Sequence, residues 1–304
     1  MYSYSIIQWL FFFYFYCFGG WCVESAYVSV RSKKLTNRGF MRGPFLPLYG
    51  SGALMMLVVS MPFQDSVVLV YLAGCVGATI LEFVTGVVME ALFQVRYWDY
   101  TGKKFSYKGH ICLTSSLFWG VLTILTTELI HVPVERLMYA IPGKVLSVVT
   151  ILLTMAIVAD FTLSFKAAID IRELLAKMDS TKEELVRIQK RLDSIITAAG
   201  ESLGNRKDAI VESVDEIKSG IEDKLEKIKT LATTKPSAYL ESVKEEVTEL
   251  LKKYAINVEI RNRLGSIKDF FQRDMLRSNP SMTSSRYKEA LDELKQKTMH
   301  DEKE

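Results

Sequence analysis

The hydrophobic residues of this chain gather into five long runs in its first half. A hydrocarbon core of about 30 Å needs roughly 20 apolar residues in a helix. The runs therefore predict five transmembrane helices, and the short connection at 63–66 makes the second and third helices a tight hairpin. The predicted helices cover residues of about 6–30, 45–62, 67–92, 111–130 and 145–165.

The second half shows a different pattern, in which apolar residues recur at alternating spacings of four and three. This spacing is the seam of a coiled coil. The seam breaks at Gly200 and Gly204, resumes from Ile210, and ends a helix at Lys235-Pro236. A self-contained helical hairpin and an oligomerising coil both fit the pattern. The first part of the seam consists of Leu174, Met178, Thr181, Leu185, Ile188, Leu192 and Ile195.

Together the two patterns predict an all-α, polytopic membrane protein. A transmembrane domain covers 1–165, and a helical or coiled-coil domain covers 166–304. The basic residues of the short connections lie mainly in 31–43 and 93–110. Because lysine and arginine favour cytoplasmic loops, we expect the N-terminus outside and the C-terminal tail inside.

Composition narrows the classes of function. The net charge of +3 is too small to indicate binding to nucleic acid. The four cysteines all fall within hydrophobic runs, so packing roles are favoured over a disulfide framework. No phosphate-binding loop, hydrolase elbow or zinc motif occurs, and the three histidines are far apart in the sequence. We therefore expect no enzymatic activity, catalytic residue, metal site or cofactor. An ATP-driven role would need a separate ATPase subunit.

Acidic residues inside the hydrophobic runs are the candidate functional groups. A charge within hydrocarbon costs at least a few kcal/mol, so such residues commonly mark a site or an ion pair. Glu24 and Glu82 lie deep, whereas Glu90 and Asp160 could instead extend to the interface. The predicted polar pocket, which would bind a cation or hold internal ion pairs, consists of Glu24, Arg38, Arg42, Glu82, Glu90, Arg96, Trp98 and Asp99.

Two glutamates occupy matching settings. When residue n is aligned with residue n+66, Gly20 meets Gly86 and Glu24 meets Glu90 without a gap. Each Gly-x-x-x-Glu is followed by a basic loop and a further hydrophobic run. This match predicts a parallel internal repeat of the kind found in transporters. Coincidence within a shared topology is the alternative.

The loop at 37–52 carries prolines and glycines that oppose a regular helix. We interpret it as a partly re-entrant loop that lines a pocket, or as a plain helix start with proline in its first turn. Either Arg38 or Arg42 could pair with Glu24. In the second loop, Asp99 is poorly suited to contact with lipid and is expected to have a fixed partner.

These loops carry a resemblance to a known family. The chain resembles the putative ABC-transporter permease family (type IV, CmpB-like) over about residues 5–165, and more weakly at 279–291. The family usually has Ser and Asn where this chain has Thr101 and Ser106. The matching residues are Gly20, Glu24, Arg38-Gly39-Phe40, Gly43-Pro44-Phe45, Pro47, Tyr49-Gly50, Gly52, Glu82, Glu90, Trp98-Asp99-Tyr100, Gly109, Ile111-Cys112-Leu113 and Trp119-Gly120.

The resemblance implies a multi-pass protein of a bacterial cell membrane, in contact with the lipid bilayer and a separate ATPase subunit. The leading hypothesis is a transporter-type membrane subunit with a pocket facing the cytoplasm. A membrane-anchored scaffold or regulator, acting through its tail, is the first alternative. An enzyme acting on lipid headgroups at the inner leaflet is the second. A second copy of the chain, bound through the tail to form a homo-oligomer, is a further possible partner.

Overall fold

The structure is a computed structural model that describes residues 4–198, 214–234, 238–264 and 269–300. It divides the chain into two compact units. The first unit joins Met1–Arg172 to Ile267–Glu304, and the second is Glu173–Ser266. The boundary predicted at 165 lies inside one continuous helix, α6, Gly143–Ala198. The C-terminal segment groups with the first half of the chain instead of with the tail.

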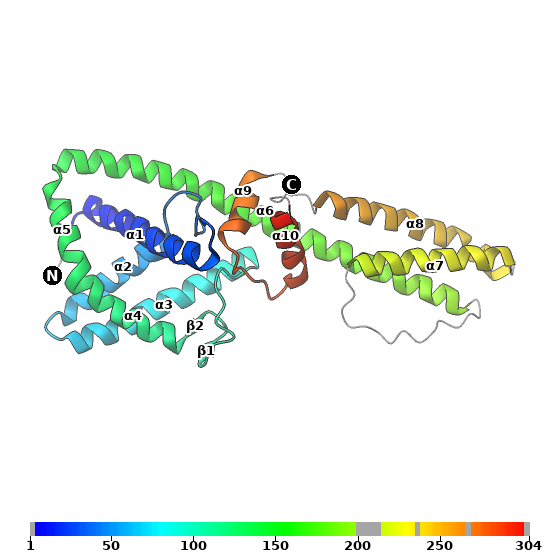
Figure 1. The fold of residues 1–304 in the computed structure, drawn as a ribbon, viewed down its shortest axis with the longest axis horizontal. Coiled ribbons are helices and arrows are strands. Elements are labelled where there is room, and N and C mark those ends of the chain that lie inside the picture. The colour runs from blue at the N-terminus through cyan, green and yellow to red at the C-terminus, as the bar shows by residue number, and fades with distance from the viewer. Residues whose placement is uncertain (1–3, 199–213, 235–237, 265–268, 301–304) are drawn as a thin grey trace. The chain divides into compact units, whose positions relative to one another are not determined.

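The first unit is built from helices that run back and forth (Figure 1). A 3-10 helix, Met61–Phe63, extends α2, and a π-helical stretch, Leu125–Ile130, joins α4 to α5. The antiparallel strands β1, Ser106–Tyr107, and β2, Ile111–Cys112, were not predicted from the sequence. The helices before α6 are α1, Ile6–Ser32; α2, Pro47–Ser60; α3, Val67–Phe93; α4, Leu113–Ile124; and α5, His131–Ala140.

The ends of these helices follow from local chemistry. Ser5 and Gln8 form a capping box that begins α1. Left-handed residues, Lys33 and Gln94, end α1 and α3. Pro47 stands in the first turn of α2, where its missing N–H costs nothing. The 37–52 region is therefore irregular only up to Leu46, and a helix start with proline, one of the two interpretations, is observed.

Small residues let neighbouring helices of the first unit approach closely. Side chains and backbone of α1 surround Gly50 in α2, while Thr123 in α4 lies against Gly74 in α3. Tyr71 and Cys75 of α3 in turn cover Gly120 of α4. Such small-residue contacts are typical of helices packed in a membrane, where burial of apolar surface supplies little driving force.

Within the described residues, four helical segments are long and apolar enough to cross a membrane: Ile6–Ser32, Val67–Phe93, Leu113–Ala140 and Gly143–Thr197. The second predicted span corresponds to the shorter apolar helix Pro47–Phe63. The all-α class of the membrane part is confirmed, apart from the two short strands. The count of five spans and their orientation stay predictions.

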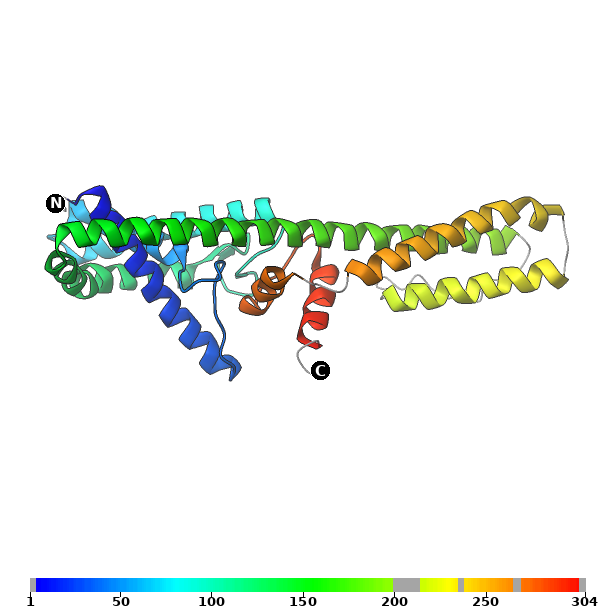
Figure 2. The same ribbon diagram turned by 90° about the horizontal axis from the view of Figure 1, so that it is seen from above.

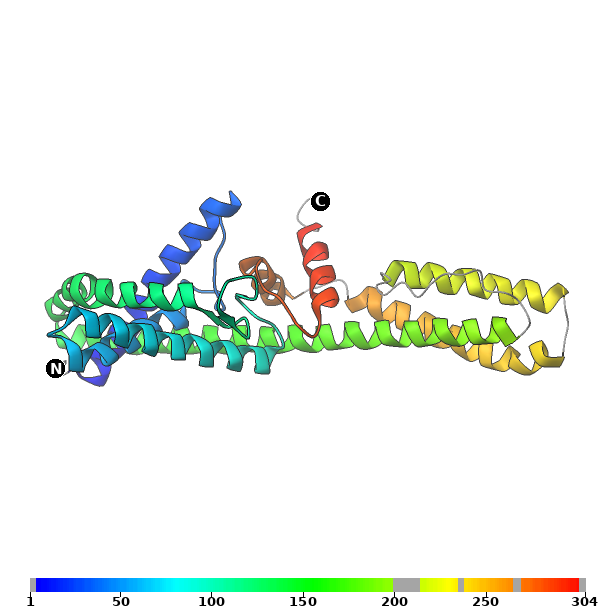
Figure 3. The ribbon, with the colours of Figure 1, turned by 90° about the horizontal axis from the view of Figure 1, so that it is seen from below.

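The C-terminal segment of the first unit forms two further helices, α9, Phe270–Ser278, and α10, Lys288–His300. The predicted turn at 278–281 and the helix after it are confirmed, although this helix begins three residues later than expected. Figures 2 and 3 show α9 and α10 beside α6. In the same views the C-terminal end of α1 points away from α6.

The second unit has a core of its own, made by the end of α6 with α7, Val214–Thr234, and α8, Ala238–Leu264. Predicted seam residues of α6 pack against Ile217 and Ile221 of α7, and Tyr254 of α8 adds to the cluster. The apolar seam of α6 is thus buried against α7 and α8 of the same chain. Oligomerisation through the tail stays a prediction. The predicted breaks at Gly200, Gly204 and Pro236, and the seam residue Ile210, lie outside the described residues.

Leu192 tests this core. It is fully buried, so Leu192→Ala should destabilise the second unit by about 3 kcal/mol through lost burial and a residual cavity. The measurement is amide hydrogen exchange of α7 in the full-length protein, which should lose protection. Lys190→Ala, at an exposed position of the same helix, is the control and should change nothing. Unchanged protection in Leu192→Ala would contradict the packing.

Candidate functional site

Three glutamates of the membrane helices each lie in a separate polar cluster. Glu24 comes from α1, whereas Glu82 and Glu90 come from α3. They do not share partners, as expected from the eight-residue separation of the last two. A charge in a poorly hydrated environment is costly unless it is paired and hydrogen-bonded, so the partners of each carboxylate define its role.

Glu24 is held by a tyrosine and an arginine. The hydroxyl of Tyr49 donates to Oε2 of Glu24 over 2.7 Å. Nε of Arg38 lies 3.6 Å from Oε1 of the same carboxylate. Of the two arginines that could pair with Glu24, Arg38 is therefore the one in contact, and the two opposite charges balance one another.

Glu90 has an equivalent pair of partners from the second loop. Nε of Arg96 lies 2.8 Å from Oε1 of Glu90, and Nε2 of His110 lies 3.1 Å from Oε2. Burial lowers the pKa of His110 below its ordinary value of 6.5, although the charge of Glu90 acts in the opposite direction. The imidazole is therefore neutral at neutral pH and donates from Nε2.

The glycine of each Gly-x-x-x-Glu motif makes room for the ring that contacts its glutamate. A Cβ at Gly20 would clash with the ring of Tyr49, and a Cβ at Gly86 would clash with the ring of His110. The two motifs thus share one local design: glycine, a ring above it, the glutamate, and an arginine from the following loop. This likeness supports the repeat at the level of the motif, and the full repeat stays a prediction.

Glu82 is the most deeply buried of the three glutamates and has only uncharged partners. It is 4% exposed. Tyr100 donates to Oε1 over 3.0 Å, and Ser115 and Trp119 donate to Oε2 over 3.2 and 3.0 Å. These donors come from the second loop and from α4, so the carboxylate binds both to α3.

The predicted fixed partner of Asp99 is also present. The backbone N–H and the hydroxyl of Thr101 donate to Asp99, and Nη1 of Arg96 lies 3.8 Å away. Burial alone would raise the pKa of Asp99, but the hydrogen bonds from Thr101 and the charge of Arg96 outweigh it and lower that pKa. Asp99 therefore stays ionised and anchors the loop.

The C-terminal segment Ser278–Ser285 closes over both arginine–glutamate pairs. Nη1 of Arg38 donates to the carbonyl of Ser278 and to Oδ1 of Asn279, and its Nη2 donates to the hydroxyl of Ser281. The backbones of Arg96 and Thr283 exchange two hydrogen bonds, of 2.7 and 2.9 Å.

Two further contacts fix the same segment. The amide of Asn279 donates to the carbonyl of Gly39 over 2.8 Å, and the hydroxyl of Ser285 donates to Glu90 over 2.9 Å. Residues about 240 positions apart in the chain thus form one polar layer at the loop end of the helices.

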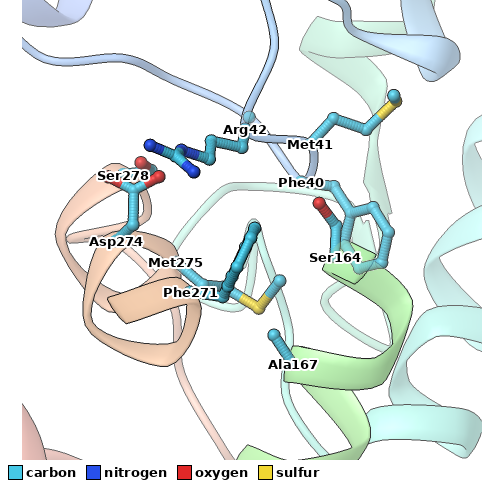
Figure 4. A pocket seen from close by; sticks show the side chains of 10 residues that line it. Phe40, Met41, Arg42, Ser164, Ala167, Phe271, Asp274, Met275 and Ser278 are labelled. Atoms are coloured by element: carbon cyan, nitrogen blue, oxygen red, sulfur yellow. The ribbon is translucent and has the colours of Figure 1, made fainter. Parts of the chain in front are cut away.

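Arg42 is not part of this layer. Its guanidinium lies over the ring of Phe270, 4.3 Å from the centroid, and beside Phe271. It faces Asp274, and burial raises the pKa of that carboxyl despite the opposing charges of Arg42 and Arg277. The cavity here is about 10 Å³, which is room for about one water molecule (Figure 4). Arg42 therefore serves to hold α9.

A much larger cavity, of about 340 Å³, lies next to the Glu24–Arg38 pair. Of the predicted pocket residues, Glu24, Arg38 and Trp98 line it. Glu82, Glu90, Arg96 and Asp99 belong to the neighbouring clusters instead. Among the described residues no group of His, Cys, Asp and Glu that could hold a metal ion occurs.

Several residues of the site were not predicted as site residues. Tyr49, Tyr100 and Trp119 were noted only as parts of a motif, because tyrosine and tryptophan in a membrane helix usually indicate an interfacial position. For Asn279 and Ser281 the sequence offered one indication, because both fall in the short stretch at 279–291 that resembles the family more weakly. Nothing in the sequence placed that stretch against the first loop.

Long apolar helices, close contacts at small residues and paired charges at the helix ends define the chain as a multi-pass helical membrane protein. The family model described as putative ABC-transporter type IV matches residues 11–165. The chain belongs to this family. Comparison with curated proteins and with solved structures gave no match.

Gly20 tests the motif. Gly20→Ala should displace Tyr49 and destabilise the protein by about 1–3 kcal/mol, since the added methyl group overlaps the tyrosine ring. The measurement is the thermal unfolding midpoint of the purified protein in detergent. Gly19→Ala is the matched control, because an added Cβ there meets no atom within 4 Å. Equal midpoints for the two variants would contradict the proposed fit.

His110 gives a dependence on pH. Its folded-state pKa is lowered, so the unfolded chain binds more protons and stability falls as the pH drops below about 6.5. His110→Gln should reduce this loss of stability between neutral pH and mildly acidic pH. Thermal unfolding of both proteins across this range measures it. An identical pH profile for the variant would show that His110 does not carry the effect.

Proposed function

We propose that the chain is the membrane-spanning subunit of a transporter, with the cavity beside Glu24 and Arg38 as its substrate-binding site. Membership of the putative ABC-transporter type IV family supports a role in transport. The carrying observation is a cavity of about 340 Å³ with a charge pair at its wall, within the size range of small-molecule pockets.

In this proposal the cavity faces the cytoplasm. The two loops around it, 33–46 and 94–112, hold most of the basic residues of the short connections, which is typical of the cytoplasmic side. The N-terminus is then outside, and the tail is inside. A separate ATPase subunit supplies the energy, because the chain has no phosphate-binding loop of its own.

A membrane scaffold is the second candidate, and the self-contained core of the second unit favours it. The two functions respond to different changes. A scaffold acting through its tail loses function when the core at Leu192 is disrupted and tolerates the loss of charge at Glu24. A transporter subunit loses function when the residues that line the cavity are changed.

Glu24→Gln tests the transporter. The tagged full-length protein is purified from its native membrane with any bound ATPase, and ATP hydrolysis is measured after reconstitution in lipid. Loss of the Glu24 charge should lower hydrolysis by roughly tenfold, the equivalent of about 1.4 kcal/mol. Glu128→Gln, an exposed position remote in the fold, should behave as the unchanged protein does.

Protein level and thermal stability are measured beside activity. Loss of the folded protein in Glu24→Gln would indicate that the pair with Arg38 is structural. Absence of any bound ATPase, or unchanged ATP hydrolysis in the folded Glu24→Gln variant, would overturn the proposal.

A further inference from the structure

The walls of the large cavity are mainly apolar. Aliphatic side chains of α2 and α3 form one part of the lining, and Leu46 and Pro47 form its edge. Such walls suit the apolar body of a ligand, because each buried CH₂ group contributes about 0.8 kcal/mol. The aromatic side chains of the lining, apart from Tyr49, are Phe40, Phe93, Tyr97, Trp98, Phe161 and Phe165.

The polar end of the cavity is neutral overall. Glu24 and Arg38 carry opposite charges 3.6 Å apart, and Tyr49 adds a hydroxyl. A charged ligand would introduce an uncompensated charge beside apolar walls, which is costly. An uncharged head that accepts hydrogen bonds introduces none.

Contacts within the protein show which acceptors bind the N–H groups of Arg38 besides Glu24. Its Nη1 and Nη2 donate to a backbone carbonyl, an amide oxygen and a hydroxyl, supplied by Ser278, Asn279 and Ser281. All three are uncharged oxygen acceptors, and Asn279 also lines the cavity. The segment therefore offers Arg38 the kind of oxygen acceptors that the polar head of an uncharged ligand would offer.

One wall of the cavity keeps partly exposed aliphatic side chains. Val88 and Leu92 line the cavity, and they are 47% and 39% exposed. Both belong to α3, a candidate membrane span. The surroundings of α3 are then hydrocarbon, from which a molecule with an apolar body can enter.

We infer that the cavity binds an uncharged amphipathic lipid, with its chain against the aromatic wall and its hydroxyl or ester oxygens at Arg38. The inference rests on the proposed function, since it assigns the ligand class of the same cavity. The segment Ser278–Ser281 competes with the head of the lipid for Arg38.

The test uses three probes with one chain length: a monoacylglycerol, a fatty acid and an alkylamine. Binding to the full-length protein in detergent near neutral pH is measured by native mass spectrometry. The monoacylglycerol should bind roughly tenfold more tightly than either charged probe. A charged probe that binds best to the unchanged protein would overturn the inference.

Charge variants should change this order in opposite directions. Glu24→Gln leaves the charge of Arg38 uncompensated and should favour the fatty acid by roughly tenfold, whereas Arg38→Gln should favour the alkylamine similarly. Glu128→Gln and Arg136→Gln, exposed positions away from the cavity, are the controls and should keep the original order. An order that the site variants leave unchanged would also overturn the inference.

A third variant keeps the test decisive if the charge variants fail to fold. Val88→Trp fills the cavity and should weaken monoacylglycerol binding by roughly tenfold. Val84→Trp, one turn away and 50% exposed, does not line the cavity and should bind normally. Equal binding by the two variants would show that the probe binds elsewhere.

The outcomes are distinct from those for transport. Probe binding without a coupled ATPase would overturn the proposed function and leave the ligand class standing. ATP hydrolysis that depends on Glu24, without probe binding, would overturn the ligand class alone.

Discussion

The cost of keeping a carboxylate away from water governs the arrangement at the loop end of the membrane helices. An arginine offsets this cost at Glu24 and another at Glu90, whereas three uncharged donors offset it at Glu82. Each solution needs groups from another helix or loop. The carboxylates therefore determine where the loops lie, and the loops in turn form the edge of the cavity.

Glycines decide which groups can reach these carboxylates. At Gly20 and Gly86 a ring lies where a side chain would otherwise be, and elsewhere small residues bring helix backbones together. A cavity beside such close packing is notable, because most of the interior is filled. It lies at the polar cluster, lined by Glu24 of α1 and by Arg38 and Gly39 of the irregular loop.

Hydrophobic runs were enough to predict the membrane helices and the tail helices, and the basic residues of the first loop offered Arg38 as one of two candidate partners of Glu24. They could not show that Glu82 has only uncharged partners, because Tyr100 reaches it from a loop and Ser115 from α4, and both positions depend on tertiary contacts. The same limit applies to Asn279. Its hydrogen bond to the carbonyl of Gly39 joins residues 240 positions apart, and a local sequence pattern cannot predict a contact over such a separation.

That separation has a consequence for biosynthesis. Arg38 leaves the ribosome about 240 residues before Ser278–Ser281, which supply three of its oxygen partners. Until then Arg38 has only Glu24 and the carbonyl of Tyr97 among the partners seen in the fold, and its other N–H groups bind water or lipid oxygens. A chain that stops before Ser278 therefore lacks three of the contacts that join the first loop to the polar layer.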